Sequence, residues 1–333
     1  MKRRILVIAL FIAFSTQAQL IPNFGGERAG LSALSFLKND ISPRSLGMAG
    51  ASTALNGDGY SILQNPAGMY ELEGQAWTLT NSFLGAGINQ AFISAIFPLK
   101  NKTSAIGASI NTLTTGAIEE RTEFQPFGTG RLVYGTNMAV AASYSQQLSD
   151  QFSLGVTLKY VYENLADFTN HTITTDVGFL YKLDVRDLQF AVLLKNFGGN
   201  SNLSGSFLAS SFNRSTVANL EKNTLPNVFS IGVSITAWEN EHHHLLGAFQ
   251  LNHPNDNSEN YRLGLEYDYL KLLFVRGGLK MNVKGQAYPT MGVGVRTNIG
   301  AHSLFIDYAT NPTEYLGWQH LIGLNFNINR MER

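Results

Sequence analysis

Three short motifs in this chain contain residue types that could bind a metal or a nucleotide. In the first, His242, His243 and His244 form a cluster in which two imidazoles would share one face of a strand, and Glu239 or Glu241 could join them around a metal. The spacing fixes no third ligand, however, and polar residues are expected where a strand ends at a turn. The cluster therefore predicts a solvated strand end, and we expect no metal.

The other two motifs also lack the pattern that their chemistry requires. Residues 292–297 (GVGVRT) resemble a dinucleotide-binding loop but lack the third glycine and the following helix. Residues 255–259 (NDNSE) carry calcium-type ligands without the spacing of a calcium loop. The sequence also contains no nucleophile elbow, no HExxH motif and no Cys. These observations predict neither a cofactor nor an enzymatic activity.

The elements that carry these motifs show a strict period of two. Between Gln151 and Glu163, the apolar positions alternate with small, polar or charged ones, apart from Val161. Successive side chains of a β-strand point to opposite faces, so this segment is predicted to be a strand with one apolar and one polar face. A strand of this length and pattern is typical of a wall between lipid and water. The apolar face is formed by Phe152, Leu154, Val156, Leu158, Tyr160 and Tyr162.

The N-terminus and the composition indicate export to an outer membrane. Lys2, Arg3 and Arg4 precede an apolar run of ten residues, and small residues follow up to Ala18, which predicts a signal peptide over residues 1–18 with cleavage near Ala18. Only 14% of the residues are charged, against about 25% in ordinary soluble domains. The formal net charge of zero gives no footprint for nucleic acid. The alternative interpretation is a large soluble all-β protein.

Turns and alternation together predict fourteen wall strands within a barrel domain over residues 73–333. Every second connection is short, which matches the short periplasmic turns and longer outer loops of an antiparallel up-and-down transmembrane β-barrel. The outer face would contact outer-membrane lipid. The strand at 89–99 has weak contrast between its faces. The predicted strands are 75–84, 89–99, 103–113, 134–148, 151–164, 171–183, 187–197, 226–237, 242–252, 259–270, 272–282, 288–298, 301–310 and 319–329.

Residues 19–72 do not have the pattern of a wall strand. Residues 28–38 could form a short helix, and the glycines and the Asn-Pro step that follow indicate turns and close backbone approach. We predict that residues 19–72 fold into the barrel as a plug, which we call the hatch. Its motif residues, to which we assign a structural role, are Arg44, Gly47, Gly50, Asn65, Pro66 and Gly68.

Three parts of the hatch carry a family resemblance. Residues 35–37 (SFL), 43–51 (PRSLGMAGA) and 64–69 (QNPAGM) resemble the N-terminal signature of PorV/PorQ-family outer-membrane proteins, within the wider group similar to the FadL fatty-acid transporter. The resemblance implies a fourteen-stranded barrel, a bacterium of the Bacteroidetes type and a link to type IX secretion. It also implies that the protein associates with the translocon or with surface-attachment proteins, and that some members receive secreted cargo.

Two hypotheses for function follow, both without catalysis. The first is a barrel that serves type IX secretion by docking a partner or cargo through its outer loops, residues 114–133 and 198–225. Apolar residues in otherwise polar loops favour a contact surface, although a loop folded onto its own barrel mouth would explain them as well. The second is a passive, FadL-like transporter of hydrophobic molecules. An outer-membrane enzyme is a third possibility with no residue set to support it. The candidate docking residues are Phe124, Phe127, Phe207 and Phe212.

Overall fold

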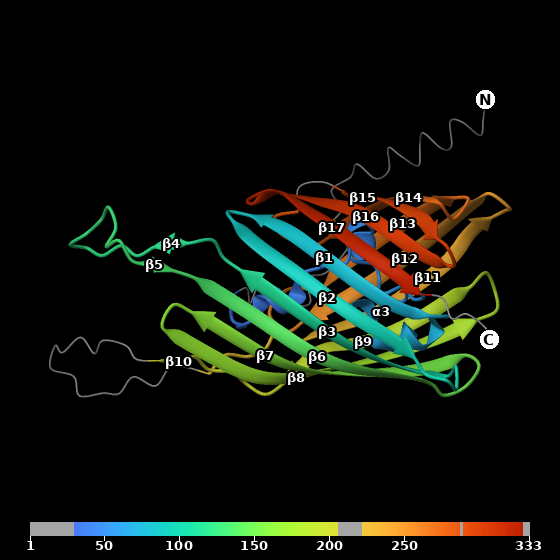
Figure 1. Cartoon of the computed structure of the whole chain (residues 1–333), viewed down its shortest axis with the longest axis horizontal. Coiled ribbons are helices and arrows are strands. Elements are labelled where there is room, and N and C mark those ends of the chain that lie inside the picture. The colour runs from blue at the N-terminus through green and yellow to red at the C-terminus, as the bar shows by residue number, and fades with distance from the viewer. Residues whose placement is uncertain (1–29, 206–221, 287–288, 329–333) are drawn as a thin grey trace, which may run out of the picture.

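The computed structural model describes residues 30–205, 222–286 and 289–328, which form a closed antiparallel β-barrel around a plug (Figure 1). The predicted signal peptide lies outside the described residues. Fourteen of the described strands make the wall, each hydrogen-bonded to the next, and the pairing of β8 with β9 closes the ring. The prediction of a fourteen-stranded barrel is confirmed. The wall strands are β1 (Gln75–Gly85), β2 (Ile88–Pro98), β3 (Ser104–Thr114), β6 (Gly135–Gln147), β7 (Phe152–Leu165), β8 (Phe168–Leu183), β9 (Leu188–Gly198), β11 (Val228–Glu239), β12 (His243–Pro254), β13 (Asn260–Tyr269), β14 (Leu273–Met281), β15 (Thr290–Ile299), β16 (His302–Thr313) and β17 (Gly317–Ile328).

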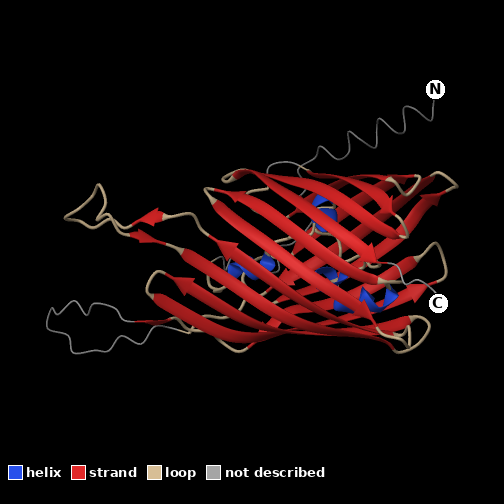
Figure 2. Ribbon diagram, viewed as in Figure 1, coloured by secondary structure: helices blue, strands red, loops and turns tan. Residues whose placement is uncertain are grey.

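The two ends of the barrel differ. At one end, which we call the turn end, β1 begins, β17 ends and the connections are short (right side of Figure 2). At the other, the loop end, a two-stranded hairpin of β4 (Ile118–Glu119) and β5 (Leu132–Val133) projects beyond the wall, and β10 (Ser204–Gly205) pairs with β8. The two long connections lie at this end, as predicted, but β1 and β2, β7 and β8, and β16 and β17 are also joined here, by turns of two or three residues.

The wall strands have an apolar outer face and a polar inner face. On β7 the predicted outward residues Val156, Leu158 and Tyr160 are exposed, whereas Ser153 and Thr157 are buried toward the lumen. The same alternation recurs around the ring, so the barrel presents a continuous apolar surface of the kind that hydrocarbon requires. Among the described residues, none of the helices has the length and apolar character needed to cross a membrane.

Tryptophan marks both ends of this apolar surface. Trp77 lies near the start of β1 and Trp238 near the end of β11, both at the turn end, while Trp318 lies at the start of β17 at the loop end. All three side chains are about half exposed. Tryptophan at strand ends forms the aromatic girdles that sit at the two membrane–water interfaces.

The weak contrast of the second wall strand has a packing explanation. On β2, Phe92 and Ile96 face the lumen and are almost completely buried. They form a cluster with Ile41, Ile62 and Met69 of the hatch. Apolar residues can therefore face this polar lumen where the hatch covers them, because the hatch removes them from water.

The described part of the hatch, residues 30–72, crosses the lumen as short helices joined by turns. The predicted helix over residues 28–38 is present only as the 3₁₀ helix η1 (Ser35–Lys38), because Leu34 has a left-handed conformation with φ of 56°. Residues 28 and 29 lie outside the described residues. The remaining helices are α2 (Pro43–Gly47), α3 (Ser61–Gln64) and η2 (Pro66–Glu71).

Glycines on the lumen face of the wall let the hatch backbone touch the strands. A Cβ added at Gly278 of β14 would lie 2.4 Å from the backbone of Met48 and Ala49. A Cβ at Gly155 of β7 would lie 2.2 Å from the backbone of Pro66 and Ala67. The same kind of contact explains Gly292, within residues 292–294, which resemble a nucleotide loop in the sequence. Gly292 lies against Gly47 of the hatch. These glycines therefore shape the lumen to the hatch.

Two neighbouring glycines of β14 test this contact. We expect Gly278→Ala to displace the hatch, because the new methyl group would overlap backbone atoms that cannot rotate away. Overpacking of this kind costs about 1–3 kcal/mol of unfolding free energy. The measurement is urea unfolding of the barrel in detergent, together with the rate of proteolysis within the hatch. Gly277→Ala is the matched control, because no atom lies within 4 Å of the position of its Cβ. Equal stability of the two variants would contradict the proposed contact.

Candidate functional site

The hatch is attached to the wall through Arg44, the first charged residue of the predicted motif. Its Nε and Nη2 donate to the two carboxylate oxygens of Glu266 on β13 at 3.0 and 2.7 Å, and its Nη1 donates to Asp58 at 2.8 Å. Burial lowers the pKa of Arg44, but the carboxylates of Glu266 and Asp58 outweigh burial, so the pKa lies above its usual value. Arg44 thus stays charged and bridges two parts of the hatch to the wall.

The wall continues this network. Arg276 of β14 donates to Glu266 at 2.6 Å and also to Asp307 of β16. Glu266 and Asp307 are both almost fully buried, and each accepts from an arginine. The arginines compensate the charge of both buried carboxylates, and removal of either partner would leave an uncompensated buried charge. The network is an anchor.

The other predicted hatch residues lie where the chain turns or touches the wall. Gly47 contacts the backbone of β15, and Gly50 has a φ of 82° and leaves room for the guanidinium of Arg262. Asn65 caps η2 by accepting from the backbone N–H of Ala67. Its amide also donates to Phe179 O on β8 at 3.1 Å.

Pro66 and Gly68 belong to η2 itself. Pro66 is the first residue of this helix, a position that suits its fixed φ, and it lies against Gly155. A Cβ at Gly68 would lie 2.7 Å from the side chain of Asn56. The structural role that the sequence predicts for these residues stays a prediction, and their positions at close contacts support it.

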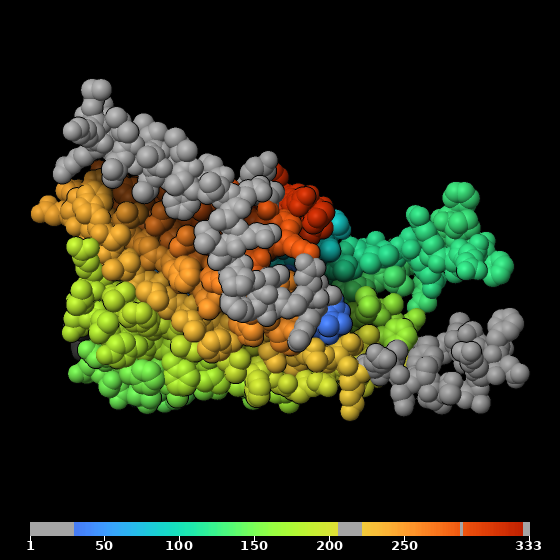
Figure 3. Space-filling view, turned by 180° about the vertical axis from the view of Figure 1, so that it is seen from behind, coloured from blue at the N-terminus to red at the C-terminus, as the bar shows by residue number. Residues whose placement is uncertain are grey.

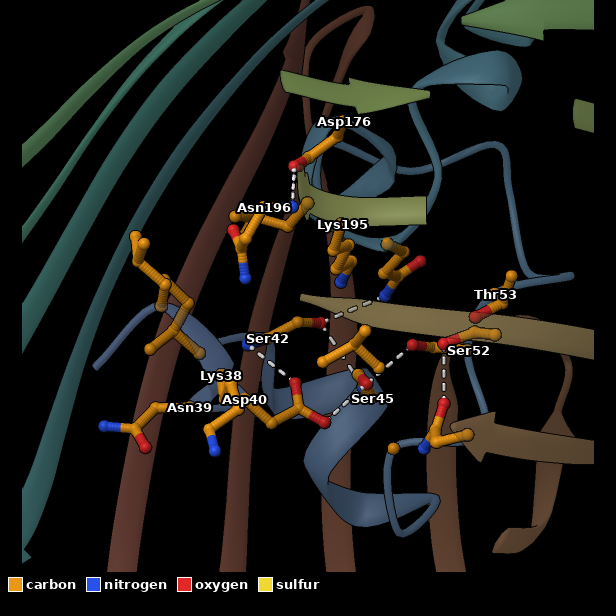
Figure 4. Close-up of a pocket in the computed structure, with 18 of the residues that line it drawn as sticks. Lys38, Asn39, Asp40, Ser42, Ser45, Ser52, Thr53, Asp176, Lys195 and Asn196 are labelled. Atoms are coloured by element: carbon orange, nitrogen blue, oxygen red, sulfur yellow. Dashed lines mark hydrogen bonds between the residues drawn. The ribbon is translucent and has the colours of Figure 1, made fainter. Parts of the chain in front are cut away.

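A cavity of about 270 Å³ lies between the hatch and the wall in the half of the lumen toward the loop end (Figure 4). Asp40 and Ser45 line it from the hatch, and Ser45 Oγ donates to Asp40 at 2.7 Å. Lys195 and Arg262 line it from the wall. Polar residues outnumber apolar ones in the lining, but apolar side chains such as Ile41, Ile62 and Phe92 also face the cavity, so its surface is mixed.

One wall of the cavity is a charged network at a break in the strand pairing. The register of β8 and β9 shifts next to Asp176, and this carboxylate accepts from the backbone N–H of Asn196 at 2.7 Å. Lys159 lies 2.6 Å from the same carboxylate. No motif in the sequence marks these residues, and they are not among the predicted site residues. Their signal was their place on the lumen face of predicted strands, where a charge needs a partner.

The loop end exposes two of the four predicted docking residues. Phe124 and Phe127 lie between β4 and β5 and are 94% and 93% exposed. The hairpin projects beyond the barrel rim (Figure 3). Phe207 and Phe212 lie outside the described residues. Phe124 and Phe127 are therefore not packed on the part of the barrel mouth that the structure describes.

Comparisons with known proteins agree with this geometry. The family model described as Type IX secretion system protein PorV matches residues 26–184, which include the hatch motifs and the first six wall strands. The resemblance to the PorV family is confirmed. None of the curated proteins compared with the chain matches it.

The PorV-like chain also shares its fold with solved outer-membrane channels. The CymD monoaromatic hydrocarbon channel has 13% identity and a TM-score of 0.56, with 88% of this chain and 98% of that one covered. A Pseudomonas aeruginosa FadL homologue has 12% identity and a TM-score of 0.56, with 90% and 100% covered. The Ralstonia pickettii toluene transporter TbuX has 13% identity and a TM-score of 0.54, with 86% and 96% covered. At these identities the likeness shows the fold, that of an outer-membrane β-barrel.

The histidine cluster of this PorV-like barrel lies at the turn end. His243 stacks against Trp238 with ring centroids 5.5 Å apart, and His244 Nδ1 lies 2.8 Å from Asp268. No group of three potential metal ligands occurs in residues 30–205, 222–286 and 289–328. His243 thus packs in the aromatic girdle, and His244 is hydrogen-bonded to Asp268.

Removal of the Arg44 anchor should loosen the hatch. Arg44→Met would leave Glu266 and Asp58 without their shared cation, and a buried pair that loses one partner costs about 3–5 kcal/mol. We expect a lower midpoint of heat-induced unfolding in detergent. Arg121→Met is the control, since the Arg121 side chain is 65% exposed and pairs only with exposed Glu119. If both variants unfold at the wild-type temperature, Arg44 does not anchor the hatch.

Proposed function

We propose that this PorV-family barrel docks a component of type IX secretion, either secreted cargo or a translocon or attachment partner, through its loop end. The observation that carries the proposal is the exposure of Phe124 and Phe127 beyond the barrel rim. Aromatic side chains are enriched at the centres of protein interfaces, where they contribute a large share of the binding energy. The match to the PorV family model supports the association with type IX secretion.

The hairpin that carries these residues is an extension of the wall. Backbone hydrogen bonds join Glu120 to Arg131 and to Thr129, each at 2.9 Å. Arg131 also lies 2.7 Å from Asp167 in the turn between β7 and β8. The backbone hydrogen bonds define the hairpin, and the exposed Arg131–Asp167 pair adds a weak contact to the neighbouring turn.

The orientation of the barrel follows from its two ends. Outer-membrane barrels place their short turns in the periplasm and their longer loops outside. The turn end, where β1 begins and β17 ends, is therefore periplasmic in this proposal, and the loop end faces the cell exterior. A partner at the cell surface would meet the hairpin first.

The second hypothesis, passive transport of hydrophobic molecules, would need a greasy pocket under the hatch. The cavity there mixes polar and apolar side chains, which gives this route less support than a wholly apolar pocket would. Phe274, an apolar residue of the lumen face, packs against Phe305 and beneath Arg276 and is not part of that lining.

Replacement of the two exposed phenylalanines tests the docking proposal. We expect the double variant Phe124→Ser, Phe127→Ser to retain roughly a tenth or less of the co-purified secretion proteins, because truncation of an interface aromatic typically costs about 2 kcal/mol. The measurement is affinity purification from native outer membrane with quantification of the associated proteins.

A matched control keeps the result interpretable. Tyr315 lies in another loop-end turn and is 80% exposed, so Tyr315→Ser removes an exposed aromatic outside the hairpin. Heat-modifiable migration on gels should show a folded barrel for both variants. If the double variant keeps the wild-type level of co-purified proteins, the hairpin is not the docking surface.

A further inference from the structure

Three cations on the loop-end half of the lumen wall have no ion-pair partner among the residues that the structure describes. They are Lys195 of β9, Arg262 of β13 and Lys280 of β14, all toward the loop end. The register places Arg262 directly opposite Lys280, and both face the lumen. Like charges directly opposite on neighbouring strands destabilise a sheet. This arrangement therefore calls for an anion between them.

The acidic residues of this region do not supply that anion. Asp176 is held by Lys159 and by the backbone of Asn196, as described above. Asp256 is paired with Lys38 at 2.5 Å. Asp176 also acts electrostatically on Lys195, and Asp40, whose carboxylate already accepts from Ser45, acts on all three free cations. Because Asp176 is shared with Lys159, these two carboxylates leave an excess of positive charge.

The cations that contact the hatch nearer the turn end are paired with carboxylates, in contrast to these three. There Arg44 and Arg276 share Glu266, Arg276 also pairs with Asp307, and Lys182 lies 2.5 Å from Glu71 of the hatch. The cations that hold the hatch are thus paired with protein carboxylates. The free cations lie on the other side of the hatch, where the lumen opens to the loop end.

The three free cations line two neighbouring cavities. Lys195 and Arg262 line the cavity of about 270 Å³, and Arg262 and Lys280 line a neighbouring one of about 180 Å³. Residues 38–40 and Arg262 border both cavities. Asn257 and Asn282, next to the loop-end rim, also line the larger cavity. We call this space the vestibule.

We propose that the vestibule binds a phosphate-type oxyanion between Arg262 and Lys280, with Lys195 facing it across the cavity. The planar guanidinium of arginine matches two oxygens of such a group, while a lysine ammonium acts as a compact point charge. A phosphate carries close to two negative charges at neutral pH and can compensate both opposed cations, whereas a single carboxylate would leave one of them uncompensated.

Polar groups around the cations complete the site. Gln250 and Asn252 line the same cavity, and Asn260 accepts from Arg262 Nε at 3.1 Å, which orients the guanidinium. Gln250 Nε2 already donates to Asn252 at 2.7 Å, and Asn252 Nδ2 donates to Asn260 at 3.0 Å. The second N–H of each carboxamide is the one that could donate to a phosphate oxygen. The phosphate source is either a small free anion or the headgroup of a lipid that reaches the loop-end rim. The proposal is independent of docking by the hairpin, which uses none of these residues.

Calorimetric titration of the purified full-length barrel in non-ionic detergent tests the site. The two probes are inorganic phosphate and short-chain dibutyryl phosphatidic acid, with chloride used to keep the ionic strength constant. We expect saturable binding by the wild type and binding about tenfold or more weaker in the double variant Arg262→Gln, Lys280→Gln. Lys100→Gln, in an exposed turn at the other end of the barrel, should bind as the wild type does.

The outcomes are distinct. Tighter binding of inorganic phosphate supports the site with a free anion as its source, and tighter binding of the phosphatidic acid supports it with a headgroup. Absence of saturable binding of either probe to the wild type would overturn the proposal, as would a double variant that binds like the wild type. If the double variant does not migrate as a folded barrel, Lys280→Gln alone carries the test and should still weaken binding severalfold.

Discussion

A backbone that crosses hydrocarbon must satisfy its hydrogen bonds within the protein, because lipid offers neither donors nor acceptors. Closure of the fourteen wall strands into a ring meets this constraint, since each strand has two partners and no edge remains. The ring then dictates the chemistry of its faces. Every second side chain contacts lipid and must be apolar, whereas the others point into an interior that water, charges or the hatch have to fill.

The interior is filled in two different ways. Toward the turn end, glycines bring the hatch backbone against the strands, and the pairs around Arg44 and Arg276 neutralise the buried charges. Toward the loop end, the lumen widens into the vestibule, where positive charge exceeds negative charge. The plug thus separates a lumen region balanced by the protein itself from one that is open to an external anion.

The two features at the loop end differ in kind. The hairpin offers exposed aromatic side chains beyond the barrel rim, which suits a protein surface that buries them. The vestibule offers cations and amides in a small cavity, which suits a compact hydrophilic anion. A rigid barrel supports both, because neither feature requires the wall to open.

The sequence determined the wall almost completely. Alternation and turn residues placed each strand within about three residues of its observed bounds, because lipid on one side and water on the other impose a period of two on the chain itself. The weak contrast of β2 was also visible in the sequence. Its cause was not, since Phe92 and Ile96 face a hatch that folds back from an earlier part of the chain.

Only the tertiary structure decided which lumen residues meet. Arg44 and Glu266 are 222 positions apart, and Arg262 lies opposite Lys280 only through the register of β13 and β14. The local sequence pattern predicts which face of a strand a side chain lies on. It does not predict which residue lies opposite on the next strand, or how far the side chain is from the hatch. Those contacts depend on long-range pairing and on the path of the plug, which arise when the whole ring closes.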